Sequence, residues 1–61
     1  MEKVESIYNV KIIEEIFQVG PAKAIRMMES DLMGFKIGKE WRCLKKDVEA
    51  YIKRQIAERG N

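Results

Sequence analysis

A short stretch near the middle of the chain alternates apolar and basic residues on both sides of a glycine. Residues 35–44 read Phe-Lys-Ile, then Gly-Lys-Glu, then Trp-Arg-Cys-Leu. An alternation of period two around a turn residue predicts a half-buried β-hairpin. A hairpin of two strands is only marginally stable by itself in water, so it must pack against the helical segments on either side. The chain is therefore expected to fold as a small helical domain that carries one basic hairpin.

The loop length of this hairpin decides which side chains share a face. A two-residue loop at 38–39 would mix apolar with charged groups on both faces. A three-residue loop at 38–40 would instead gather apolar side chains on one face, pairing Ile37 with Trp41 and Phe35 with Cys43. Since a slip of one residue exchanges the two faces, burial favours the three-residue loop. Trp41 is then expected in the core and not as a stacking platform.

The same register would place Lys36 directly opposite Arg42 on the solvent-facing side. Like charges across a strand pair are unfavourable, and an anionic group such as a phosphate would remove that penalty. A solvated face on which two long side chains keep apart accounts for the pair equally well. The basic face is thus compatible with an anionic partner without requiring one.

Length and composition narrow the class of protein. The 61 residues suffice for one domain, expected to span 1–61 with its core at about 8–56. With no His, no Thr and only two Ser, a nucleophile beside an imidazole base cannot be built. Cys43, the only cysteine, is expected to be a small core residue, and one thiolate without imidazole makes no zinc site. We therefore expect no enzyme activity, no metal and no cofactor.

The same composition bears on location. A single unpaired cysteine, no apparent secretion signal and no long apolar run favour a cytoplasmic protein that has no membrane segment.

Positive charge is concentrated in the middle of the chain. The net charge is +2 overall, but residues 1–20 carry −2, residues 21–46 carry +4, and residues 47–61 balance. A small net positive charge that is concentrated in one segment is typical of a surface that binds an anionic partner.

Two helical segments are expected before the hairpin. Asn9 is a good N-cap, and an apolar stripe at helical spacing follows it: Val10, Ile13, Ile16 and Phe17. This helix should end near 18–19, because Gly20-Pro21 breaks it and starts the next one. The second helix, at 21–30, has an apolar side of Ala24, Ile25, Met27 and Met28. Lys23 and Arg26 lie three residues apart and share its exposed face.

A third helix is expected after the hairpin, beginning at Lys45. Its apolar residues are Val48, Tyr51, Ile52 and Ile56, and Gly60-Asn61 ends it. Residues 1–8 are expected to be a frayed lead-in whose Ile7 and Tyr8 touch the core. The resulting fold class is mainly α with a β-hairpin, in the order α-α-ββ-α. Two short helices joined by a tight turn and followed by a hairpin make a small winged helix-turn-helix.

This order and two motifs resemble the excisionase-like and MerR-like DNA-binding domains of phages, mobile elements and bacterial regulators. The motifs are Phe-Lys-Ile-Gly-Lys-Glu-Trp-Arg-Cys at 35–43 and Lys-Lys-Asp-Val-Glu-Ala-Tyr-Ile at 45–52, and the resemblance covers about residues 8–54. It implies that the helix at 21–30 enters the major groove while the hairpin, as the wing, lies on the backbone or the minor groove. The implied DNA-binding residues are Lys23, Arg26, Lys36, Lys39 and Arg42.

The resemblance implies a non-catalytic, sequence-specific DNA-binding protein. Within that class, an excisionase-type recombination directionality factor of a phage or mobile element competes with a small transcriptional regulator. The expected absence of a ligand domain and of a long coiled coil favours the first role. Expected partners are double-stranded DNA and either an integrase or recombinase or adjacent copies of the chain on the DNA, with no membrane and no small-molecule ligand. The alternative class is a protein-interaction module whose basic face meets an acidic partner.

Overall fold

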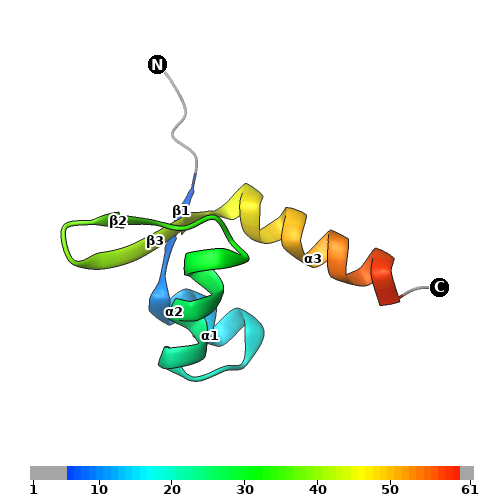
Figure 1. Ribbon diagram of the computed structural model, residues 1–61, viewed down its shortest axis with the longest axis horizontal. Coiled ribbons are helices and arrows are strands. Elements are labelled where there is room, and N and C mark those ends of the chain that lie inside the picture. Colours follow the sequence, from blue (N-terminus) through cyan, green and yellow to red (C-terminus); the bar gives the residue numbers. More distant parts are fainter. Residues whose placement is uncertain (1–5, 60–61) are drawn as a thin grey trace, which may run out of the picture.

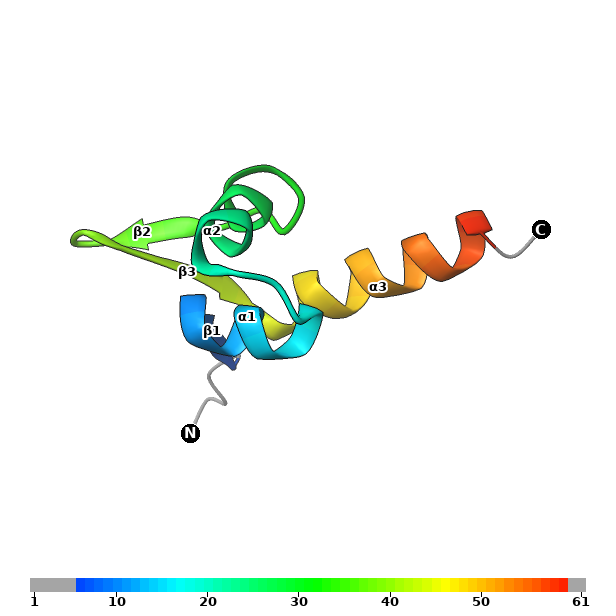
Figure 2. The same ribbon diagram turned by 90° about the horizontal axis from the view of Figure 1, so that it is seen from below.

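A computed structural model describes residues 6–59 as three helices and a three-stranded antiparallel sheet, a mixed α/β arrangement (Figure 1). The elements run in the order β1 (Ile7–Asn9), α1 (Val10–Phe17), α2 (Pro21–Ser30), β2 (Phe35–Ile37), β3 (Glu40–Leu44) and α3 (Lys45–Arg59). Helices α1 and α2 lie together on one side of the sheet. Helix α3 leaves the sheet at the end opposite the β2–β3 turn (Figures 1 and 2). Within residues 6–59, no helix combines the length and the apolar character needed to cross a bilayer.

The expected order α-α-ββ-α is wrong at its start, because β1 precedes the first helix. This strand pairs with β3, which places β3 in the middle of the sheet, and Tyr8 lies opposite Cys43. The amide of Lys45 also donates a 3.0 Å hydrogen bond to the Ser6 carbonyl beyond the strand. Three residues show too little alternation to be recognised as a strand, and only the partner strand stabilises them. The rest of the expected lead-in, residues 1–5, lies outside the described residues.

The caps of α1 and α2 confirm the expected boundaries. The Asn9 side chain accepts a 3.0 Å hydrogen bond from the Ile12 amide, one of the donors that a helix start leaves unpaired. Helix α1 ends at Phe17, and α2 begins with Gly20 as N-cap and Pro21 as its first residue. Local capping chemistry alone is thus sufficient to define this pair of helices.

The core lies between the two helices, the middle strand and the start of α3. Its buried residues are Ile13, Ala24, Met27, Met28, Leu32, Cys43 and Val48. The ring of Phe17 meets that of Tyr51 edge to face, with centroids 5.8 Å apart, which joins α3 to α1. Further along α3, Ile56 is 53% exposed, so the last turns of this helix extend past the core.

The hairpin forms where expected, but the predicted register is wrong. Strand β2 pairs with β3 through a two-residue loop, Gly38-Lys39, and the opposed pairs are Phe35 with Arg42, Lys36 with Trp41, and Ile37 with Glu40. Phe35 and Ile37 therefore lie on the face of the sheet away from the core, and both are exposed. Of the four side chains expected in the core, only Cys43 is fully buried, and Trp41 is half-buried.

Turn chemistry explains this register. Gly38 has a φ of +66°, whereas the φ of Lys39 is not positive. A positive φ at the first loop residue alone is typical of a type II′ turn, which favours Gly at that position. The turn end of the hairpin also projects beyond α1 and α2 (Figures 1 and 2). Both faces meet solvent there, so burial cannot select between the two registers.

Candidate nucleic-acid interface

Helix α2 presents two basic side chains on its exposed face, as its sequence predicts. Lys23 and Arg26 are exposed, while Ala24, Met27 and Met28 on the other side are buried. Neither cation forms an ion pair among residues 6–59. Together with Met27, Ser30 and Asp31 they line a shallow hollow of about 290 Å³ along the helix. Both cations are therefore available to an anionic partner.

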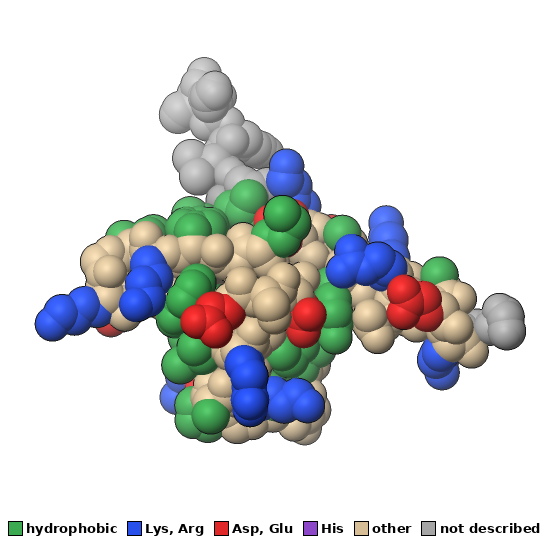
Figure 3. Space-filling view, in the orientation of Figure 1, with side chains coloured by type: hydrophobic (Ala, Val, Ile, Leu, Met, Phe, Trp, Pro, Cys, Tyr) green, Lys and Arg blue, Asp and Glu red, His purple; other side chains and the backbone are tan. Residues whose placement is uncertain are grey.

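The hairpin adds two further cations near its turn. Lys39 is the second loop residue, and Lys36 lies on the side of the sheet that faces the helices. The Lys36 ammonium lies 5.5 Å from the centroid of the Trp41 ring, within cation–π range. Figure 3 shows basic side chains at the hairpin turn and over the N-terminal half of α2, on the same side of the molecule. The described structure thus places two pairs of exposed cations on neighbouring elements.

Arg42 does not share a face with Lys36, contrary to the sequence prediction. Its guanidinium lies on the outer face of the sheet and donates a 2.9 Å hydrogen bond to the Glu40 carboxylate. A second guanidinium nitrogen donates to the Trp41 carbonyl at 3.0 Å. The Arg42 side chain is only 26% exposed, and its charge is already paired. It is consequently less available to a phosphate than the other four cations.

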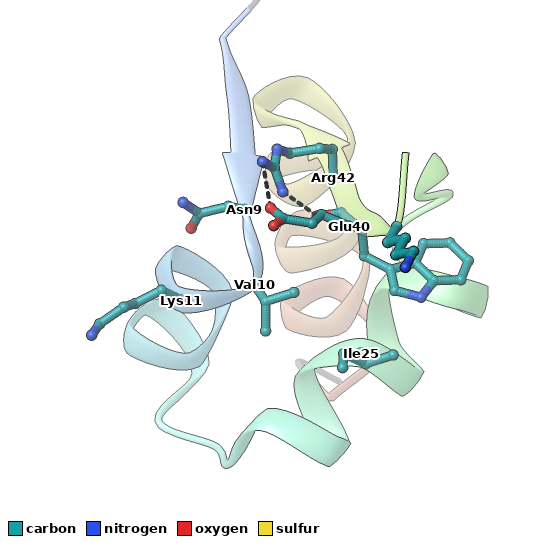
Figure 4. Close-up of a pocket in the computed structure, with 8 residues that line it drawn as sticks. Asn9, Val10, Lys11, Ile25, Glu40 and Arg42 are labelled. Carbon is teal, nitrogen blue, oxygen red and sulfur yellow. Dashed lines mark hydrogen bonds and ion pairs between the residues drawn. The ribbon is translucent and has the colours of Figure 1, made fainter. Parts of the chain in front are cut away.

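A pocket of about 350 Å³ lies between the start of α1, the middle of α2 and β3 (Figure 4). Val10 and Ile25 point into it, and the Arg42–Glu40 pair lies at its upper side, whereas Lys11 points outward. Lys39 and Trp41 also line it. Sequence reasoning did not select Lys11, because its place at the edge of a pocket that β3 also lines follows from tertiary packing and leaves no local pattern. The pocket has an apolar floor and a rim of mixed charge.

The buried thiol of Cys43 is not a reactive nucleophile. Burial, with a smaller effect from the nearby Asp47 carboxylate, raises the pKa of the Cys43 thiol to about 11. The thiol is therefore protonated at neutral pH, and its side chain is fully buried. Within residues 6–59, no three His, Cys, Asp or Glu side chains come together as a potential metal site.

Comparison of the chain with protein-family models, with curated proteins and with solved structures finds no match. The interface described above accordingly rests on its own residues and geometry.

Proposed function

We propose that this protein is a non-catalytic, sequence-specific DNA-binding protein built as a small winged helix-turn-helix. In this proposal α1 and α2 are the helix-turn-helix and β2–β3 is the wing. The observation that carries it is the unpaired cationic face of α2, Lys23 and Arg26, beside a projecting hairpin that carries Lys36 and Lys39. Cations on two adjacent projecting elements suit a duplex, which offers phosphates on both sides of a groove.

The shape of α2 supports a role as the recognition helix. An α-helix with its side chains is about 10–12 Å in diameter, and a major groove about 12 Å wide admits it. The first exposed residues of α2 are Pro21, Ala22 and Lys23, so no bulky side chain keeps the helix start from the base edges. Gly20 supplies no side-chain cap and Pro21 has no N–H, so the amides of Ala22 and Lys23 are the ones free to donate to a phosphate. Arg26, one turn further on, is the side chain suited to a bidentate contact with guanine.

In this proposal the wing contacts the sugar-phosphate backbone of the DNA. Lys39 lies at the turn, and Lys36 is held over Trp41, which limits the directions in which its ammonium can point. Contacts of this kind fix register on the duplex without reading sequence. Arg42 contributes least of the five cations, because Glu40 already neutralises it.

Two biological roles fit such a module. One is an excisionase-type recombination directionality factor of a phage or mobile element, which acts with an integrase, and the other is a small transcriptional regulator. A single module of this size buries little DNA surface, so tight binding calls for adjacent copies or a partner. A footprint on the DNA that flanks the gene distinguishes the roles, since sites at an attachment region support the first and sites at a promoter support the second.

Binding to DNA is tested by selecting sites from a random duplex pool and titrating salt on the selected site. Neutralisation of about four phosphates gives a slope of log K against log salt of about −4. A slope near zero on every duplex, or no binding at low salt, would refute DNA binding and leave the protein-interaction module with an acidic partner.

Sequence reading by α2 is tested with one variant and a matched control. Arg26→Ala should weaken binding to the selected site by about 1–3 kcal/mol and relax preference at one base pair. Arg59→Ala removes the same charge from the exposed end of α3 and should change affinity little. If Arg26→Ala weakens every sequence equally, α2 contacts phosphates only, and sequence specificity must be assigned to another surface.

A further inference from the structure

The face of the sheet away from α1 and α2 is unusually apolar for a surface. The register places seven side chains on this outer face: Ile7, Asn9, Phe35, Ile37, Glu40, Arg42 and Leu44. Ile7, Phe35 and Ile37 are exposed there, and Leu44 is half-buried. Figure 3 shows hydrophobic side chains along the margin of the molecule over the sheet, away from the basic end of α2. Four apolar side chains thus share one sheet face with Asn9, Glu40 and Arg42 between them, and exposed apolar side chains grouped on one face can mark an interaction site.

The polar groups on this outer face suggest what it binds. Glu40 and Arg42 lie beside each other on β3, so the face carries one anion and one cation and no net charge. The Glu40 side chain is 68% exposed, and the Arg42 guanidinium uses two of its nitrogens, toward Glu40 and the Trp41 carbonyl. A guanidinium has five N–H donors, so Arg42 has donors left for a second carboxylate. A strongly acidic or strongly basic partner would leave one of the two charges opposed.

From this arrangement we infer that the outer face is a self-association surface, on which two copies of the chain pack sheet to sheet about a two-fold axis. In a two-fold interface residue i contacts residue j and residue j contacts residue i. Glu40 of each copy then meets Arg42 of the other, and the apolar residues of both copies pack beside the two pairs. A surface with adjacent opposite charges beside apolar residues is complementary to itself under this symmetry.

The association is weak because the face is small. Three strands about 4.8 Å apart and at most five residues long offer well under the ~800 Å² per partner of a stable complex. We therefore expect a dissociation constant on the order of 100 µM, which populates the dimer only at high local concentration. The exposed cations of α2 are not part of this face, so self-association does not require DNA and does not depend on the proposed function.

Sedimentation equilibrium of the full chain between about 10 µM and 1 mM tests the dimer directly. The weight-average mass should rise with concentration from 7.2 kDa toward twice that value and stop there. A mass that stays at the monomer value overturns the inference, and so does a mass that grows without limit, since only a two-fold contact closes on itself.

Two isoleucines of equal exposure locate the surface. Ile37 on the outer face and Ile56 on α3 are each 53% exposed, so Lys at either position adds the same charge at similar cost to folding. Ile37→Lys should weaken dimerisation at least about tenfold, because both copies carry the change. Ile56→Lys should leave the dissociation constant within about twofold of the unmodified chain. The reverse pattern would place the contact on α3 and overturn the inference.

Charge reversal tests the pairing of Glu40 with Arg42. Glu40→Arg and Arg42→Glu should each abolish the dimer, because like charges then meet across the axis. An equimolar mixture of the two variants should regain it as a heterodimer. The double variant Glu40→Arg/Arg42→Glu restores both the pair within the chain and the match across the axis, so it should dimerise like the unmodified protein. If all variants keep their thermal melting transition and the mixture stays monomeric, the proposed pairing is wrong.

Discussion

The two ends of the β2–β3 hairpin are held by different physical constraints. At its base, Cys43 is fully buried and the amide of Gly34 donates a 2.6 Å hydrogen bond to the Met28 carbonyl at the end of α2. At its turn, Gly38 has no atom near its missing Cβ, and Lys39 is exposed. Packing therefore fixes where the hairpin leaves the domain, while backbone preference fixes how its strands align. Burial thus predicts Cys43 correctly at the base, but it misplaces Phe35 in the adjacent strand, because the alignment of the two strands is set at the turn.

The largest loss of stability should come from adding a side chain at Gly34, at the base of the hairpin. A Cβ at Gly34 would lie 2.5 Å from the Met28 carbonyl oxygen and 3.0 Å from that of Arg42, both of them backbone atoms that cannot rotate away. Gly34→Ala should therefore lower the free energy of unfolding by about 3 kcal/mol, measured by urea denaturation. A loss below about 1 kcal/mol would show that α2 and the hairpin move apart easily, and that the base is not rigid.

Alkaline pH should also lower the free energy of unfolding, because Cys43 is buried at the base of the β2–β3 hairpin. Burial, with a smaller effect from Asp47, raises the pKa of this thiol from the ordinary value of 9.0 to about 11. Because the folded state holds a proton that the unfolded state releases, this stabilisation is complete below about pH 8 and is lost as pH rises toward 11. By pH 10 the loss is about 1 kcal/mol.

The control for this pH effect is Cys43→Ala, which has no thiol to titrate. Its free energy of unfolding starts lower, since a buried group has been removed, and should fall less steeply between pH 8 and 10. Parallel pH profiles for the two proteins would mean that Cys43 is not held in a low-dielectric core.

Trp41 lies between base and turn, and its truncation should have an intermediate effect. The ring is half-buried, so Trp41→Ala should cost about 1–2 kcal/mol, below the ~3–5 typical of a fully buried Trp. Its coupling to Lys36 reports the register. A double-mutant cycle between Lys36→Ala and Trp41→Ala should show an interaction of about 0.5 kcal/mol.

The matched cycle pairs Trp41→Ala with Ile37→Ala. Ile37 lies on the opposite face of the sheet, so its coupling to Trp41 should be near zero. A strong coupling to Ile37 together with none to Lys36 would indicate the three-residue loop in solution.

Local rules predicted most of the helical part. Asn9 as a cap, Gly20-Pro21 as a combined stop and start, and the boundaries of α2 all depend on residues within a few positions of one another. The shared face of Lys23 and Arg26 follows from the same short-range geometry. These features were predictable because they do not depend on where the rest of the chain lies.

The sheet could not be predicted in the same way. Strand β1 exists through its pairing with β3, more than thirty residues later. The separation of Lys36 from Arg42 depends on a one-residue difference in the loop, and the proximity of Lys11 to the hairpin depends on how α1 packs. A local signal for the loop was nonetheless present, because Gly at the first of two loop positions is typical of a type II′ turn. In this hairpin, whose turn extends past the core, turn chemistry outweighs burial.

The smallest effect should come from the turn, where only backbone conformation is constrained. Gly38 has a φ of +66° and open space around it, so alanine there meets no clash and only the cost of a positive φ. Gly38→Ala should lower stability by about 1 kcal/mol, and Gly38→Asn by less, because Asn is among the residues that occupy positive-φ positions of such turns. Urea denaturation of both variants beside Gly34→Ala measures the contrast between turn and base. If Gly38→Ala proves as costly as Gly34→Ala, the turn is packed against something, and the hairpin does not project freely. If Asn and Ala cost the same at this position, positive φ is not what selects glycine there, and the explanation of the register through the turn must be withdrawn.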